Sequence, residues 1–187
     1  ATEECIAGEI NDQDIASLRE VLRLTYLSWQ HAALFDFGPA ADRTFSLTTN
    51  TYPTDTAEVI DEISNASWTP GLPATLNSIG LPALDYLLNH APAEEVADLM
   101  NSSPARFDHF KRLIVFLEEE SNNVLSAWEN GFSSNFISNT GTEEGSSIGM
   151  LLNSFNEAYE QGIRKQKLGL PNGIMTFSET PQPQLVE

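Results

Sequence analysis

Residues Gly80 to Asp85, of sequence GLPALD, are the residues of this chain best placed to bind a ligand. The backbone of Gly80 can approach another group closely because glycine has no Cβ, and the ring of Pro82 suits the first turn of a helix. Asp85 would lie one turn further on, where its carboxylate could accept a hydrogen bond or bind a hard cation. A single carboxylate is a poor site for zinc or iron, and Asp85 could instead stabilise the positive end of the helix dipole.

Other residues capable of chemistry are few and scattered. The three histidines, His31, His90 and His109, do not stand at metal-ligand spacing from one another, so each is expected to be structural. His109 is predicted to lie on the side of its helix away from the apolar stripe. The sequence contains no HExxH motif, no phosphate-binding glycine loop and no GxSxG elbow. Cys5 is the only cysteine, so it is either a free thiol or pairs outside these residues.

The three tryptophans, Trp29, Trp68 and Trp128, are predicted to anchor the core. Trp68 stands in a segment rich in proline and glycine, which makes it the tryptophan best suited to the rim of a pocket. Trp29 and Trp68 are therefore candidate ligand-binding residues together with Gly80, Pro82 and Asp85.

The composition limits the partners of this chain. Its 187 residues suit one domain, and 41% hydrophobic residues can form a core. The net charge of −18, with only nine lysines and arginines, argues against nucleic acid as a partner, because phosphate binding needs clustered basic side chains. No apolar run reaches the length of a transmembrane segment.

The apolar periodicity is helical along nearly the whole chain and predicts an all-α, up-and-down helical bundle. A long irregular connection is expected before the helix that begins at Gly80. Residues 45–52 could pass for a strand, but one strand alone would have no partner. The last helix is predicted to turn its apolar stripe inward, and residues 132–141 to form a loop. The other expected helices cover about residues 14–34, 55–64, 93–100, 104–130 and 143–167.

Four segments, taken in order, resemble the N-terminal half of the imelysin-like family. The family motif Gly-x-His-x-x-Glu is similar to the Gly80 segment, with Pro82 in place of the histidine and Asp85 in place of the glutamate. The other three segments are residues 29–30 with 37–39, residues 50–55, and residues 167–173 with 183–187.

This resemblance implies a domain organisation and a location. Residues 1–169 would form the family's N-terminal helical bundle, and residues 170–187 an extended tail or linker toward a second bundle, in the same chain or a separate one. The protein would be exported from a bacterium, to the periplasm or to the outer membrane or cell surface, with a role in the uptake of iron, another metal or another ligand.

The resemblance also implies a ligand cleft, formed with the second bundle, that contains Gly80, Pro82 and Asp85, with Trp29 or Trp68 nearby. A divalent metal at Asp85 is the candidate cofactor, although the sequence requires none. Because the motif histidine is replaced, we expect a binding protein rather than an enzyme. Two alternatives remain open, which are a metallopeptidase of the same family and an interaction protein whose acidic surface meets a basic partner.

Overall fold

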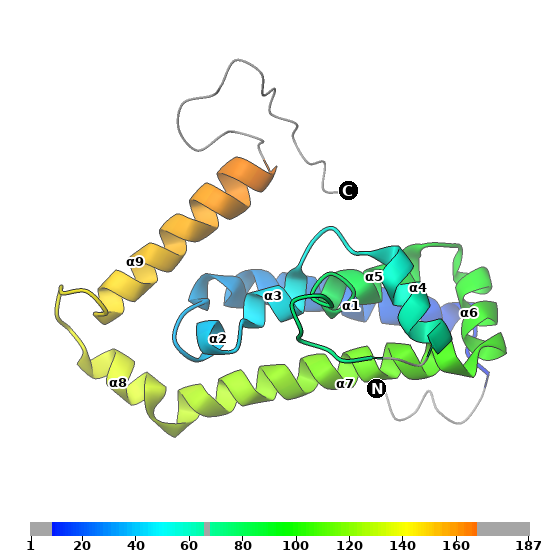
Figure 1. Cartoon of the computed structure of the whole chain (residues 1–187), viewed down its shortest axis with the longest axis horizontal. Coiled ribbons are helices and arrows are strands. Elements are labelled where there is room, and N and C mark those ends of the chain that lie inside the picture. Colours follow the sequence, from blue (N-terminus) through cyan, green and yellow to red (C-terminus); the bar gives the residue numbers. More distant parts are fainter. Residues whose placement is uncertain (1–8, 66–67, 168–187) are drawn as a thin grey trace, which may run out of the picture.

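A computed structural model describes residues 9–65 and 68–167, and all regular structure in those two ranges is helical (Figure 1). The expected all-α bundle is therefore confirmed, as is the irregular connection before Gly80. The predicted boundary between residues 169 and 170 and the tail that follows it lie outside the described residues, as does Cys5.

The described helices have the following bounds. In chain order they are α1 (Asp12–Ala32), α2 (Pro39–Asp42), α3 (Phe45–Asn50), α4 (Thr56–Asn65), α5 (Gly80–Asn89), α6 (Ala93–Ser102), α7 (Pro104–Ala127), α8 (Ser133–Ser138) and α9 (Ser147–Glu157). Three further segments extend α1, α7 and α9, namely the 3₁₀ turn η2 (Ala33–Phe35) and the π-helical segments η3 (Trp128–Phe132) and η4 (Ala158–Lys167).

Helix starts follow the local sequence. The side chain of Asn11 accepts a hydrogen bond from the backbone of Asp14, whose carboxylate accepts one from the backbone of Asn11, so α1 begins with a capping box. Ser103 caps α7 by accepting from the backbone N–H of Arg106, and Pro104 follows as the first helical residue. Both features satisfy backbone groups that a helix end leaves without partners, which is why these starts can be predicted.

Asp55 should stabilise α4 measurably, because its Oδ1 accepts hydrogen bonds from the backbone N–H groups of Ala57 and Glu58. We expect Asp55→Ala to lower the free energy of unfolding by about 1 kcal/mol, the usual cost of losing such a cap. Asp55→Asn keeps an oxygen at the same place and should recover most of the loss. Urea unfolding of the three proteins checks this, and equal losses in both variants would contradict it.

The helix α5 forms the centre of the bundle. It packs on α1 on one side and on α7 on the other, and its side chains Leu81, Leu87 and Leu88 are buried. The guanidinium of Arg19 in α1 donates to the backbone oxygens of Leu88 and Ala91, which closes the C-terminal end of α5. The core is therefore built around one short apolar helix rather than around the two long ones.

Two segments outside the expected helices are helical. Residues 45–50, which could pass for a strand without a partner, form α3, and this helix packs on α5. Residues 133–138 form α8 rather than a loop. Stacked and edge-to-face aromatic rings hold α8 against Phe37, just after η2, and against Trp128, with 5.5 Å between the ring centroids of Phe37 and Phe136.

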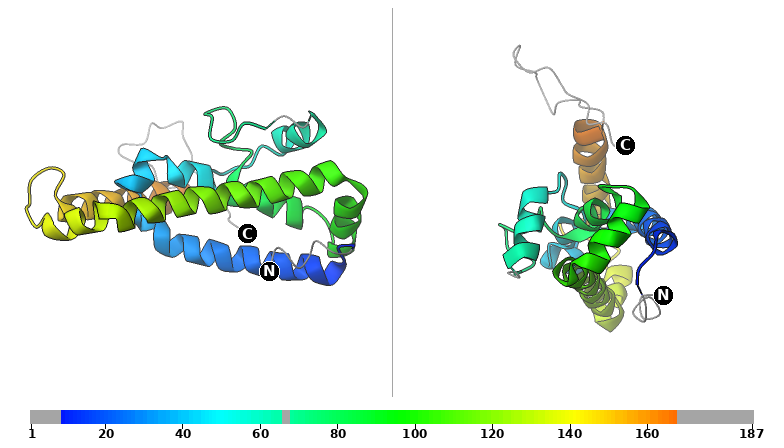
Figure 2. Two further views of the ribbon diagram at one scale, coloured as in Figure 1. Left: turned by 90° about the horizontal axis from the view of Figure 1, so that it is seen from below. Right: turned by 90° about the vertical axis from the view of Figure 1, so that its right-hand side faces the viewer.

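The last helix is also placed differently from the expectation. It leaves the bundle beyond α8 and runs away from α7, as two views show (Figures 1 and 2). The prediction that its apolar stripe faces inward is wrong, because Leu152 is 57% and Phe155 is 58% exposed. In the described part of the chain, no helix combines the length and the apolarity that crossing a bilayer requires.

Candidate functional site

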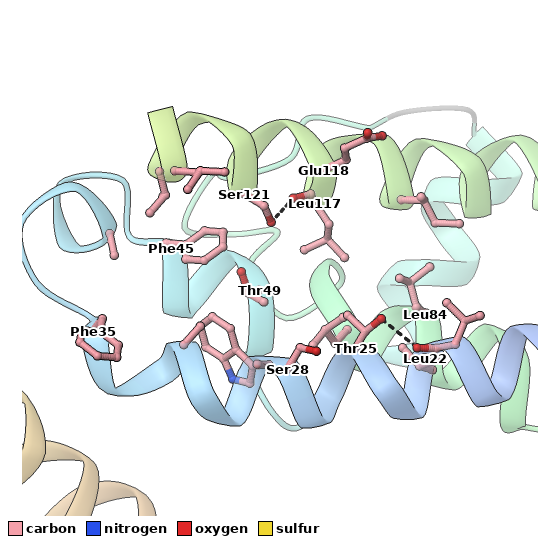
Figure 3. A pocket seen from close by; sticks show the side chains of 18 of the residues that line it. Leu22, Thr25, Ser28, Phe35, Phe45, Thr49, Leu84, Leu117, Glu118 and Ser121 are labelled. Carbon is pink, nitrogen blue, oxygen red and sulfur yellow. Dashed lines mark hydrogen bonds between the residues drawn. The ribbon is translucent and has the colours of Figure 1, made fainter. Parts of the chain in front are cut away.

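An apolar groove runs between α1 and α7, with α5 and α3 as its floor (Figure 3). Both ends are fixed by contacts between the flanking segments. At one end, the backbone of Ile10 exchanges two hydrogen bonds with the side chain of Asn101, just before α7 begins. At the other end, the rings of Phe35 and Trp128 lie 6.4 Å apart. Since α1 and α7 start together and end together, they run in the same direction along the groove.

The groove has a volume of about 780 Å³ and a lining dominated by apolar side chains. By volume it could hold about 26 water molecules, yet its walls offer few polar partners to them. This size falls within the range of pockets that bind organic ligands. Its aromatic lining residues are Trp29, Phe35, Phe45, Phe110 and Trp128.

Two of the four hydroxyl side chains along the groove make hydrogen bonds within their own helices. Thr25 donates to the backbone oxygen of Val21, and Ser121 donates to that of Leu117, so both bonds stay within one helix (Figure 3). Glu118 is the one charged residue in the lining, and Thr49 contributes a buried hydroxyl oxygen that has no hydrogen-bond partner. An apolar occupant therefore suits the groove better than a polar or charged one.

Gly80 and Pro82 build the floor of the groove without lining it. Both residues are buried, and Gly80 has a φ of +82°. A Cβ on Gly80 would lie 2.5 Å from the backbone oxygen of Thr49 and 2.8 Å from that of Thr48. The close approach predicted for this glycine is thus made to α3, and it places Leu81 and Leu84 of α5 in the groove.

Asp85 is exposed and is absent from the groove lining. Its Oδ1 accepts a hydrogen bond from the side chain of Asn89, and its charge acts on Tyr26 of α1. Burial, and then the charge of Asp85, raises the pKa of Tyr26. Within residues 9–65 and 68–167, no group of three or more His, Cys, Asp or Glu side chains could hold a metal ion. Metal binding at Asp85 stays a prediction.

The two candidate tryptophans lie in different places. Trp29 lines the groove and packs edge-to-face on Phe45, with 5.6 Å between the ring centroids. Trp68 lies outside the groove, where it packs edge-to-face on Phe116 of α7 and its ring is covered by the guanidinium of Arg112. Of the five predicted site residues, only Trp29 therefore presents its side chain to the groove.

Apart from the groove, a buried polar cluster joins α4, the 68–79 segment and α7. Sequence reasoning missed this cluster. Ser78 donates a hydrogen bond to Glu62 Oε1, and Glu62 Oε2 lies 3.7 Å from Nε2 of His109. All three residues are buried, so His109 belongs to the core, although it was predicted on the side of its helix away from the apolar stripe. The reason is that α7 is covered on two sides, by α5 and by α4. Glu62 could have been noticed, because it follows Val59 at helical spacing on the apolar side of α4.

Burial shifts the pKa values of both groups toward their neutral forms. It raises the pKa of Glu62 to about 7 and lowers the pKa of His109 to about 4, the latter with help from the positive charges of Arg112 and Arg106. The separation of 3.7 Å is within reach of an ion pair. Because both shifts disfavour charge, the pair is neutral between these two pKa values and acts as a structural contact.

The chain was also compared with known proteins. No protein-family model, no curated protein and no solved structure matches it, so the arguments about its function rest on its own residues.

Proposed function

We propose that this protein is a binding module whose groove between α1 and α7 receives an amphipathic helix from a helical partner. The observation that carries the proposal is the mainly apolar lining, which runs along one wall from Leu18 of α1 to Phe35 of η2 and along the other from Phe110 of α7 to Trp128 of η3. At 1.5 Å per residue each wall is about 25 Å long, or close to five helical turns. Recognition of this kind uses apolar anchors at successive turns of the bound helix.

A helix fits this lining better than an extended peptide. A helix satisfies its own backbone hydrogen bonds, whereas an extended segment needs partners from the walls. The hydroxyls of Thr25 and Ser121 are engaged within their own helices. Among hydroxyl and carboxyl side chains, the groove therefore offers an extended backbone only those of Ser28, Thr49 and Glu118 as further hydrogen-bond partners.

The proposal agrees with the partner that the imelysin-like resemblance implies. A helix of a second bundle, in this chain or in another, would complete the groove. Export to the periplasm or cell surface and a role in iron or metal uptake remain predictions. A metallopeptidase would need at least three metal ligands, of which Asp85 could supply one.

Fluorescence titration with a tryptophan-free amphipathic peptide tests the proposal, because Trp29 and Trp128 both line the groove. We expect saturable binding, and we expect Ser28→Glu combined with Ser121→Glu to weaken it at least about tenfold, since two carboxylates would be desolvated in an apolar site. Both serines are exposed groove-lining residues, so the fold should tolerate the change.

Two further variants complete this test. Gln30→Glu adds a charge on α1 outside the groove lining and should leave peptide binding unchanged. Asp85→Ala should also leave it unchanged, and a loss in that variant would favour the cleft predicted around the Gly80 segment. If an apolar dye binds and the peptide does not, the occupant of the groove is a small apolar ligand and not a helix.

A further inference from the structure

Resting on the proposed function, we propose that the helix received by the groove is α9 with η4 of a second copy of this chain, exchanged reciprocally between two copies. The chain carries both halves of such a contact, the groove and an exposed apolar helix face. The argument rests on the direction, the length and the charge of that helix.

The exposed face of α9 and η4 is an apolar stripe. Its members recur at intervals of three or four residues, which places them on one side of the helix. Each is about half exposed, from 46% for Ile163 to 58% for Phe155. The stripe consists of Ile148, Leu152, Phe155, Tyr159 and Ile163.

The stripe does not face the groove of its own chain. Ser154 is buried and its hydroxyl donates to the backbone oxygen of Leu34, so this side of α9 is held against η2. Leu152 lies about 200° around the helix from Ser154 and points elsewhere. Figures 1 and 2 both show α9 rising away from α7, which makes the stripe available to another molecule.

The stripe and the groove match in length and chemistry. From Ile148 to Ile163 the stripe extends about 20 Å, and each wall of the groove extends about 25 Å. A helix of this kind presents five large apolar side chains, and the groove presents aromatic and aliphatic walls with Glu118 as their one charge. Contact between them removes apolar surface of both from water.

The charge of the helix also favours transfer to another copy. Residues 147–167 contain Arg164, Lys165 and Lys167 against Glu157 and Glu160, which gives this segment a charge of +1. The chain as a whole carries −18, so the remaining residues carry −19. The helix therefore adds no like charge to the repulsion between two acidic chains. Reciprocal exchange uses the same two surfaces twice and closes as a two-fold dimer.

Sedimentation equilibrium of the full chain tests the proposal. We expect a concentration-dependent dimer of twice the 20.6 kDa chain mass. Leu152→Glu with Phe155→Glu should raise the dissociation constant at least about 100-fold, because two anchors are lost. Asn153→Glu adds a charge to the same helix off the stripe and should not. A full-length chain that stays monomeric at about 0.2 mM, where a useful dimer should form, would overturn the proposal.

Mixing two variants separates this arrangement from other dimers. The stripe variant (Leu152→Glu, Phe155→Glu) and the groove variant (Ser28→Glu, Ser121→Glu) should each be monomeric. Together they retain one intact groove and one intact stripe, so the mixture should recover a heterodimer. If the groove variant dimerises alone, the stripes pair with each other and the proposal fails.

A synthetic peptide of residues 147–167 distinguishes failure of this inference from failure of the proposed function. Peptide binding to a monomeric full-length chain would overturn the dimer and keep the helix-binding groove. Absence of peptide binding and of dimerisation would overturn both. The salt dependence of the dimer gives an independent test. Two chains of net charge −18 repel each other, so added salt should strengthen the dimer. Added salt would instead weaken the capture of a basic partner by the acidic surface.

Discussion

We expect the replacement of Gly80 with alanine to lower the free energy of unfolding by about 3 kcal/mol or more. Two costs add together. The φ of +82° disfavours any residue with a Cβ by about 1–2 kcal/mol. The added carbon would also lie 2.5 Å from the backbone oxygen of Thr49 and 2.8 Å from that of Thr48, so α3 and α5 must move apart. Backbone atoms within a packed helix cannot rotate away as a flexible side chain can, which makes this second cost the larger one.

Gly71 provides the matched control for this prediction. Its φ is +80°, but no atom lies within 4 Å of a Cβ built on it. Gly71→Ala should therefore show the conformational cost alone, about 1–2 kcal/mol. Urea unfolding of both variants measures the difference. Equal losses would mean that α3 does not press against the start of α5. Because α3 and α5 form the groove floor, Gly80→Ala should also weaken peptide binding by the folded protein.

Local sequence was sufficient for much of the fold. Caps such as Ser103 and breakers such as Gly38 act within a few residues, so the start of α7 and the end of α1 could be predicted. Residues 45–52 could pass for a strand by local propensity, and the helix α3, which packs on α5, was not expected there. The end of the long helix was predicted close to its observed place, since the backbone leaves helical geometry at Asn130 and Gly131, but α8 follows where a loop was expected.

The groove depends on contacts that local patterns do not specify. The apolar periodicity of α1 and α7 predicts that each helix buries an apolar face. It does not predict that the apolar faces of the two helices stay apart with α5 between them. The ends of the groove are set by pairs distant in sequence, Ile10 with Asn101 and Phe35 with Trp128. The same limit explains the misplaced stripe of α9. Periodicity predicted correctly that this helix has an apolar face and incorrectly that the bundle covers it.

Glu62→Gln and His109→Gln should change the pH dependence of stability in opposite directions. Glu62 has a pKa of about 7 in the folded chain, above its ordinary value of 4.5. The contribution of Glu62 to the free energy of unfolding is fully present below pH 4.5 and is lost as pH rises through 7. His109 has a pKa of about 4, below its ordinary value of 6.5. The contribution of His109 to the free energy of unfolding is present above pH 6.5 and is lost as pH falls through 4.

In the unmodified protein the two slopes oppose each other between pH 4.5 and 6.5, so the pair should contribute little pH dependence there. Glu62→Gln leaves only the slope of His109, and stability should rise with pH by up to about 1.4 kcal/mol per unit. His109→Gln leaves only the slope of Glu62, and stability should fall with pH by a similar amount. The neighbouring charges of Glu58, Asp61 and Arg112 are present in both variants and cannot produce the reversal.

Urea unfolding at pH 4.5, 5.5 and 6.5 measures these slopes. A loss of unfolding free energy that is the same at every pH does not change the slope. Glu119→Gln removes an exposed carboxylate on α7 and serves as the control for the change in total charge. If both substitutions shift the slope in the same direction, Glu62 and His109 are not a buried neutral pair.

His109 contacts the α4 side of α7, whereas Phe110 lines the groove on the other side. Peptide binding by the folded variants should therefore stay unchanged while their stability moves with pH.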